Sequence, residues 1–255
     1  MNRCWASSLG DCGGPLSDEH SVSAGLFDDA LLKVSGFDWC EGAVKEIPRA
    51  RLVQRILCRE HNGRLSPLDK AAVHAAKVFD EWLRMEQARQ EMTPRRWRIS
   101  HFEINGLYLE RWLLKTTINL ICNRDRMLGP SGTEAGKPPE ELVRIAFGID
   151  SFLDKRGLYV LAAKGYTANN TDRISLIPWG QGNVVNGMAI SFRGFILMLC
   201  LLPSGLDSNH ALDMPLKAID PEHKIDRMSL NPNYHLKAFV SRPGKYVSSK
   251  ITFKW

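Results

Sequence analysis

Three thiols and one imidazole, placed in two distant stretches of the sequence, constrain the fold more than any other feature. The first stretch reads RCWASSLGDCGGPLSDEHSVS (residues 3–23) and the second reads ILCREHNGRLSPLD (residues 56–69). The side chains concerned are Cys4, Cys12, Cys58 and His61. They form the ligand set of a closed tetrahedral Zn²⁺ site, which would bring the two stretches together in space.

The spacing of these residues is typical of zinc ligands in one half of the set only. Cys58 and His61 are separated by two residues, as in many zinc sites that open a helix. Cys4 and Cys12 lie further apart than the usual thiol pair. Glycines in the connecting loop can adopt positive φ and fold both sulfurs back to one point, namely Gly10, Gly13 and Gly14. The alternative is four reduced side chains that lie apart in a core.

A second set of polar residues lies beside the zinc candidates and differs from them in chemistry. Glu19 and His20 follow the first pair of thiols, and Asn62 directly follows His61. Oxygen and nitrogen donors suit a hard divalent ion, and an imidazole can act as a general base. The two stretches therefore carry candidates for a structural ion and for a catalytic one.

The order of these residues resembles the zinc-knuckle branch of the HNH endonucleases. The resemblance rests on the two Cys, on Glu-His in LSDEH, and on Leu-Cys-x-x-His-Asn followed by Leu-x-x-x-Asp in LCREHNGRLSPLD, and it covers about residues 3–69. It implies a treble-clef-like ββα unit with a structural zinc on Cys4, Cys12, Cys58 and His61. It also implies His20 as the general base and Glu19 and Asn62 as ligands of a catalytic Mg²⁺ or Mn²⁺ ion.

Two parts of the family pattern have no counterpart here. No Asn lies between His20 and Cys58, where the family has the middle Asn that orients the base. The Pro-Gly-Gly-rich continuation is replaced by Ser-Val-Ser-Ala at residues 21–24. The resemblance predicts a metal-dependent endonuclease, a hydrolase of phosphodiester bonds, with DNA as the first and RNA as the second choice of substrate. The alternative is a catalytically inactive, zinc-scaffolded module that binds nucleic acid or protein.

The positive charge of the chain lies outside the candidate metal unit. Residues 1–75 hold 9 Lys and Arg against 10 Asp and Glu, so 25 of the 34 basic and 18 of the 28 acidic residues lie beyond residue 75. A basic surplus permits nucleic acid as a partner. The densest cationic patch could pair with phosphates while its ring stacks on a base, and it consists of Arg95, Arg96, Trp97 and Arg98. The alternative for this patch is an exposed linker.

Composition and cysteine usage indicate an ordinary globular protein of a reducing compartment. Hydrophobic residues make up 44% of the chain and charged residues 24%. The six cysteines, without an apolar stretch after Met1, do not suggest a secreted disulfide framework, so we expect a cytoplasmic protein. The longest apolar run, FILMLCLL, is far shorter than the roughly 20 residues of a membrane span. We expect no membrane partner, and a protein partner or a homo-oligomer stays open.

Hydrophobic periodicity predicts the remaining elements. Ser66-Pro67 is typical of a helix start, and apolar residues at helical spacing continue to about Glu91. A strand is predicted at 98–104, and an apolar stripe predicts a helix at 107–122. The polar residues of that helix are expected on its exposed faces, namely Glu110, Arg111, Lys115 and Asn119. A capped helix and four strands should follow, at 139–147, 158–163, 173–177, 183–190 and 192–202.

These elements predict the α+β fold class. The N-terminal treble-clef-like ββα zinc unit would occupy residues 1–75. Residues 76–255 would form a second domain of helices packed on an antiparallel sheet, with the strand at 192–202 in its centre.

Overall fold

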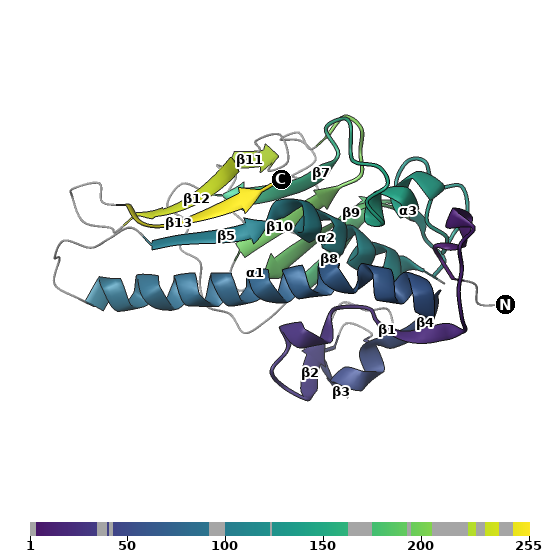
Figure 1. Cartoon of the computed structure of the whole chain (residues 1–255), viewed down its shortest axis with the longest axis horizontal. Helices are drawn as coiled ribbons and strands as arrows, with labels where there is room; N and C mark the ends of the chain where they lie inside the picture. Colours follow the sequence, from purple (N-terminus) through teal and green to yellow (C-terminus); the bar gives the residue numbers. More distant parts are fainter. Residues whose placement is uncertain are drawn as a thin grey trace.

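One long helix, α1 (Arg59–Glu91), separates the two parts of the molecule. The structure is a computed structural model and describes residues 4–34, 40, 43–91, 100–122, 124–162, 175–192, 195–205, 224–227, 233–239 and 247–255. Short N-terminal strands lie on one side of α1 near its start, and the larger sheets lie on its opposite side (Figure 1). The fold is therefore a mixture of helices and sheets, which confirms the predicted α+β class.

The N-terminal part consists of two small antiparallel pairs of strands. β1 (Leu16–His20) pairs with β4 (Val53–Cys58), from Leu16 opposite Cys58 to His20 opposite Val53. β2 (Leu31–Val34) pairs with β3 (Lys45–Pro48). One 3-10 turn, η1 (Ser7–Leu9), precedes β1, while η2 (Ala24–Leu26) lies between β1 and β2 and η4 (Arg49–Leu52) lies between β3 and β4. Because β4 runs directly into α1, two paired strands and a helix meet at Cys58.

The start of α1 differs from the prediction. The N-cap expected at Ser66 is wrong, because the helix begins at Arg59 and carries Pro67 inside it. A proline in a helix has no N–H for the carbonyl four residues earlier, and its ring crowds that carbonyl. The residue concerned is Gly63, and the space where its Cβ would lie is open, so this turn has room to adjust.

Nine strands on the other side of α1 form two sheets. They are β5 (Ser100–Asn105), β6 (Met127–Leu128), β7 (Gly157–Ala162), β8 (Ser175–Gln181), β9 (Val184–Phe192), β10 (Phe195–Cys200), β11 (Lys224–Arg227), β12 (Asn233–Phe239) and β13 (Val247–Lys254). The larger sheet has the order β11-β7-β10-β9-β6, and β8 also pairs with β9. The predicted central strand is confirmed, because β10 lies between β7 and β9 and is antiparallel to both.

The second sheet was not predicted, apart from β5. Its order is β12-β13-β5, and β13 runs parallel to β5. β11, β12 and β13 all come from residues 206–255, a polar segment for which the sequence pattern predicted no element.

The largest hydrophobic cluster of the described residues, here called the core, joins the two parts. Phe79 of α1 stacks on Phe195 of β10 with ring centroids 4.2 Å apart, and Phe253 of β13 lies 6.4 Å from Phe79. The same core includes Trp5 at the N-terminal end of the described chain. The predicted domain boundary at residue 75 falls inside α1 and inside this core.

The two remaining helices lie where they were predicted, but one of them buries polar residues that were expected to be exposed. α2 (Gly106–Ile121) and α3 (Glu140–Ala146) match the predicted ranges closely. The expectation that the polar residues of α2 are exposed is wrong for three of them, because Glu110, Lys115 and Asn119 are 4%, 1% and 0% exposed. Each has a buried partner: Glu110, for example, accepts a hydrogen bond of 2.8 Å from the backbone N–H of Leu158.

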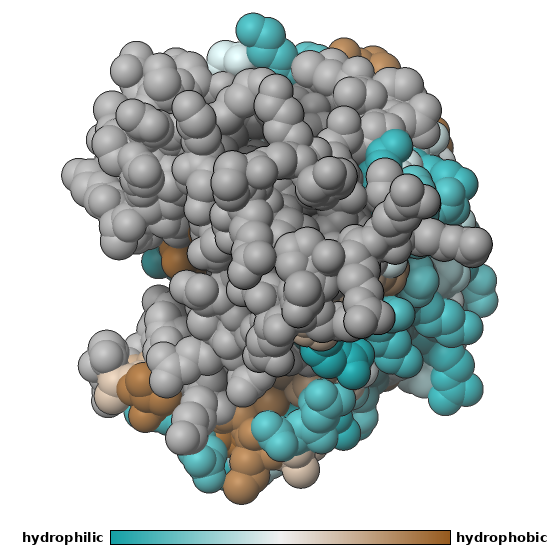
Figure 2. Space-filling view, turned by 90° about the vertical axis from the view of Figure 1, so that its left-hand side faces the viewer, coloured by the Kyte–Doolittle hydropathy of each residue, from teal (hydrophilic) through white to brown (hydrophobic). Residues whose placement is uncertain are grey.

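The large exposed hydrophobic side chains of the described residues lie in two elements and in connecting segments. They are Leu31 of β2, Tyr108 of α2, and Val44, Ile149 and Leu153 outside helices and strands. On the face seen in Figure 2, the hydrophobic residues of the described part form separate brown groups among hydrophilic ones. Within the described residues, no helix combines the length and the apolar character that a membrane span requires.

The N-cap of α2 provides a test of the fold. The Asn105 side chain accepts a hydrogen bond of 2.9 Å from the backbone N–H of Tyr108. We expect Asn105→Ala to lower the free energy of unfolding by about 1 kcal/mol, because it removes this cap. Asn105→Ser keeps an acceptor oxygen and should lose less than half as much. Equal losses in chemical denaturation for the two variants would contradict this role.

Candidate metal centre and adjoining pocket

The four residues predicted as zinc ligands converge in the structure. One ligand atom from each of them lies within 4.8 Å of the others. Cys4 and Cys12 flank η1, Cys58 ends β4, and His61 lies in the first turn of α1. All are buried except Cys12. The cluster could therefore hold a metal ion where the N-terminal loop, the strand and the helix meet.

Glycines shape the loop that carries the first two sulfurs. Gly10 and Gly14 have positive φ values of 78° and 71°, as predicted. Gly13 acts differently, because a Cβ there would lie 3.1 Å from the Cβ of Glu60. The missing side chain allows the carbonyl of Gly13 to accept a hydrogen bond of 3.2 Å from the N–H of Glu60. This bond satisfies one of the free N–H groups at the start of α1.

The ring of His61 has the orientation of a metal ligand. Its Nδ1 lies 3.2 Å from the Sγ of Cys4, 3.3 Å from that of Cys58 and 3.7 Å from that of Cys12. Its Nε2 lies 2.7 Å from Oδ1 of Asp11. An ionised carboxylate only accepts hydrogen bonds, so we assign the ring proton to Nε2. The lone pair of Nδ1 then faces the three sulfurs.

Asp11 is a supporting residue that the sequence analysis missed. Its carboxylate accepts from His61 and, over 2.5 Å, from Nη1 of Arg64, and these two bonds hold its pKa below the usual value. Arg64 in turn lies over the ring of Phe147, which contacts the His61 ring edge-on. A carboxylate on the second nitrogen of a ligand His is a common feature of zinc sites, since it fixes the ring and raises its basicity.

The thiols of the cluster differ in how readily they ionise. Burial raises the pKa of the Cys4 thiol to about 12. Burial also opposes ionisation of Cys58, but backbone hydrogen bonds from His61 and Gly13 outweigh it and hold the pKa of that thiol below its ordinary value. Several thiolates this close together repel one another, so a bound cation would be needed to ionise all three.

Glu19, the first predicted ligand of a catalytic ion, is held by α2. Its Oε1 lies 2.7 Å from Nζ of Lys115 and accepts a hydrogen bond of 3.0 Å from Nδ2 of Asn119. Nζ of Lys115 also donates to both oxygens of Asp69, over 2.9 and 2.7 Å. Burial raises the pKa of the Glu19 carboxyl, and Lys115 opposes that shift. A buried ammonium group thus lies between two carboxylates of the N-terminal part.

Asn62, the second predicted ligand, contacts β1 instead. Its Nδ2 donates to Oγ of Ser17 over 3.0 Å and to the carbonyl of Asp18 over 3.2 Å. Glu19 and Asn62 therefore use their polar groups on different partners. Their role as ligands of a divalent ion stays a prediction.

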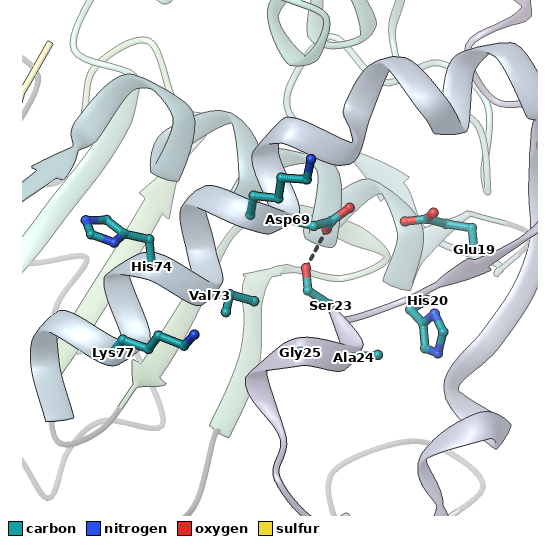
Figure 3. Close-up of a pocket in the computed structure, with 10 residues that line it drawn as sticks. Glu19, His20, Ser23, Ala24, Gly25, Asp69, Val73, His74 and Lys77 are labelled. Carbon is teal, nitrogen blue, oxygen red and sulfur yellow. Dashed lines mark hydrogen bonds between the residues drawn. The ribbon is translucent and has the colours of Figure 1, made fainter.

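His20, the predicted base, lies half-buried at the end of β1 and lines a pocket of about 400 Å³. Burial lowers the pKa of its imidazole, and the cations Arg49 and Lys115 lower it further. Figure 3 shows the pocket between the β1–η2 segment and α1. The residues that line it are Glu19, His20, Ser23, Ala24, Gly25, Asp69, Lys70, Val73, His74 and Lys77.

Ser23 connects the pocket to the interior. Its hydroxyl donates to Oδ1 of Asp69, drawn as the dashed line in Figure 3, and accepts a hydrogen bond of 2.8 Å from Nε1 of Trp112. Together with Lys115, this bond ties Asp69 in place. Asp69 therefore uses its carboxylate on partners within the protein.

Sequence reasoning missed Lys115 and Asn119 because it assigned them to solvent. A usable signal lies in their neighbours, since apolar residues occur on nearly every face of α2 and leave few positions for exposed polar side chains.

The predicted cationic patch, Arg95, Arg96, Trp97 and Arg98, lies outside the described residues.

Comparisons with known proteins give no relative for this chain. No family model matches it, and neither the curated proteins nor the solved structures contain a match. The resemblance to the HNH endonucleases therefore rests on the residues quoted above alone.

The contact between Asp11 and His61 predicts an effect on metal affinity. We expect Asp11→Ala to weaken metal binding about 10- to 100-fold, because the His61 ring loses the acceptor that orients it. Competition with a chromophoric chelator measures the change. The matched control is Asp18→Ala, which removes an exposed carboxylate bound to Arg55 and should leave the affinity unchanged. Equal affinities of wild type and Asp11→Ala would contradict this role.

Proposed function

We propose that this chain is a nucleic-acid-binding protein whose binding unit, formed by β1, β4 and α1, is held together by zinc. The observation that carries the proposal is the charge around the pocket between β1–η2 and α1. The resemblance in residues 3–69 adds support and favours DNA over RNA as the partner.

Zinc is the metal that best suits the Cys4, Cys12, Cys58 and His61 cluster. Thiolate and imidazole donors in a tetrahedral set favour zinc over harder ions such as Mg²⁺. With all four positions taken by protein, such a site has no open position for water, and its role is structural. The ion would tie the N-terminal loop to the start of α1 and so fix the position of β1.

The pocket combines paired carboxylates with unpaired cations. Lys115 pairs with both Glu19 and Asp69 from the protein interior and offsets one of their two negative charges. Lys70 and Lys77 are exposed on α1, and within the described part of the chain neither has an ion-pair partner. Arg49 adds a positive charge near His20. Unpaired cations beside a polar pocket attract the phosphates of a nucleic-acid strand and release bound counterions.

A second candidate function is hydrolysis of the bound strand, and the position of His20 favours it. The His20 imidazole lines this pocket and could take a proton from a water molecule beside a bound phosphate. A catalytic Mg²⁺ or Mn²⁺ ion would stabilise charge on the phosphate. Hydrolysis ranks second because Glu19 and Asn62 are engaged with Lys115 and β1.

The zinc proposal predicts the metal content and the result of losing a ligand. Elemental analysis of the purified chain should give about one zinc per molecule, and Cys58→Ala should lose it and unfold its N-terminal part. Cys200→Ala removes an equally buried thiol outside the cluster and should keep the zinc. A well-folded wild type without zinc would refute the proposal.

The two candidate functions differ in the effect of His20→Ala. Plasmid, single-stranded DNA and RNA are each incubated with the protein in Mg²⁺, in Mn²⁺ and without added divalent ion. We expect the protein to bind each nucleic acid, with an affinity that falls as the salt concentration rises. His20→Ala should bind equally well, because the affinity comes from the cations. The control is His101→Ala, which removes an exposed imidazole from β5.

Cleavage decides between the candidates. If wild type cuts any of these substrates and His20→Ala cuts about 10²-fold or more slowly, hydrolysis becomes the function. Intact nucleic acid under every condition leaves binding as the function. No binding to any substrate would overturn the proposal.

A further inference from the structure

We infer that the pocket between η2 and α1 is a site for one nucleotide of a single strand, with its phosphate on α1 and its nucleoside toward Ser23 and His20. This inference rests on the proposed function and names the part of the ligand that enters the protein. Three features of the pocket support the inference: its size, the arrangement of charged side chains along it, and the pairing of its carboxylates with Lys115.

The size of the pocket selects the ligand. At about 400 Å³ it lies near the lower end of the range for small-molecule sites, about 300–1,000 Å³. A lone phosphate would leave most of this space empty, and a double helix is too wide to enter. One phosphate with its sugar and base is the nucleic-acid unit that the space suits.

Two lysines and a histidine lie on one face of α1. Lys70, His74 and Lys77 are spaced i, i+4 and i+7, so their side chains lie on successive turns of the same face. Lys70 and Lys77 are about 10 Å apart along the helix axis. His74 between them is held by a hydrogen bond of 3.1 Å between its Nε2 and the carbonyl of Glu103. This face is where a phosphate would bind.

The end of the pocket nearest β1 offers hydrogen-bond acceptors. Figure 3 shows His74 and Lys77 at one end, Glu19 and His20 at the other, and Ser23 and Asp69 between them. The carboxylate oxygens can accept hydrogen bonds from the amino groups of a base or from a sugar hydroxyl. The pocket thus offers lysines along α1 for a phosphate and acceptors toward β1 for a nucleoside.

An apolar surface lies between the two ends. It is formed by Ala24, Gly25 and Val73. Gly25 permits η2 to approach α1 closely, because a Cβ there would lie 2.9 Å from Cγ2 of Val73. A sugar or a base can pack on such a surface, whereas an inorganic anion gains nothing from it.

Lys115 makes the carboxylate end compatible with an anionic ligand. Its ammonium group is 1% exposed and bonds both Glu19 and Asp69 from the protein side. Without it, two negative charges would repel a phosphate in the same pocket. With it, the carboxylates remain acceptors while the pocket and its rim carry a net positive charge.

Titration calorimetry on the full chain tests this site. The probes are a 2′-deoxynucleoside 5′-monophosphate, the nucleoside without phosphate, inorganic phosphate and a single-stranded DNA oligonucleotide. We expect the monophosphate to bind more tightly than either of its parts. The double variant Lys70→Ala/Lys77→Ala should weaken monophosphate binding about tenfold or more, because charged hydrogen bonds are lost. It should also flatten the salt dependence of oligonucleotide binding by up to about two units of slope.

A matched control and a pocket-filling variant sharpen the test. Lys137→Ala removes an exposed lysine that pairs with Glu134 away from the pocket and should change nothing. Ala24→Leu should weaken monophosphate binding while phosphate binding stays the same, because it fills the apolar middle of the pocket.

The outcomes separate this inference from the proposed function. Oligonucleotide binding that the double variant leaves unchanged would overturn the inference and keep the function. A monophosphate that binds in the pocket while no polynucleotide binds would support the site and overturn the function. Phosphate alone binding as tightly as the monophosphate would overturn the assignment of a nucleotide.

Discussion

The fold of the N-terminal part depends on the meeting of three thiols and one imidazole at the start of α1. Cys4, Cys12, Cys58 and His61 come from a loop, a strand end and a helix turn that are distant in the sequence. Asp11 orients the imidazole from its far side. A metal ion in this cluster would add its binding free energy to the folding of this part, and thereby fix β1 with His20 at its end.

A second constraint joins that unit to the rest of the molecule. Lys115 of α2 is buried between Glu19 of β1 and Asp69 of α1, and removal of an ammonium from such a place leaves uncompensated charges. Its position also sets the chemistry of the pocket. Because the two carboxylates are paired with an internal cation, part of their negative charge is offset. This pairing underlies the proposal that the pocket binds an anionic ligand.

The metal cluster and most elements could be predicted from sequence, and the reasons differ. The spacing of Cys58 and His61 is typical of zinc ligands, and the continuous apolar run of β10 indicates a buried strand. The start of α1 was mistaken because Ser66-Pro67 has the local pattern of a cap, while tertiary contacts extend the helix back to Arg59. Lys115 and strand β13 depend on partners distant in the chain, such as β5, which no local pattern contains.

X-ray absorption spectroscopy of the zinc-loaded chain measures directly whether the four side chains bind one metal ion together. We expect three sulfur ligands at about 2.3 Å and one nitrogen ligand at about 2.0 Å. Coordination by oxygen and nitrogen only, or by fewer than three sulfurs, would show that the four side chains do not share the ion.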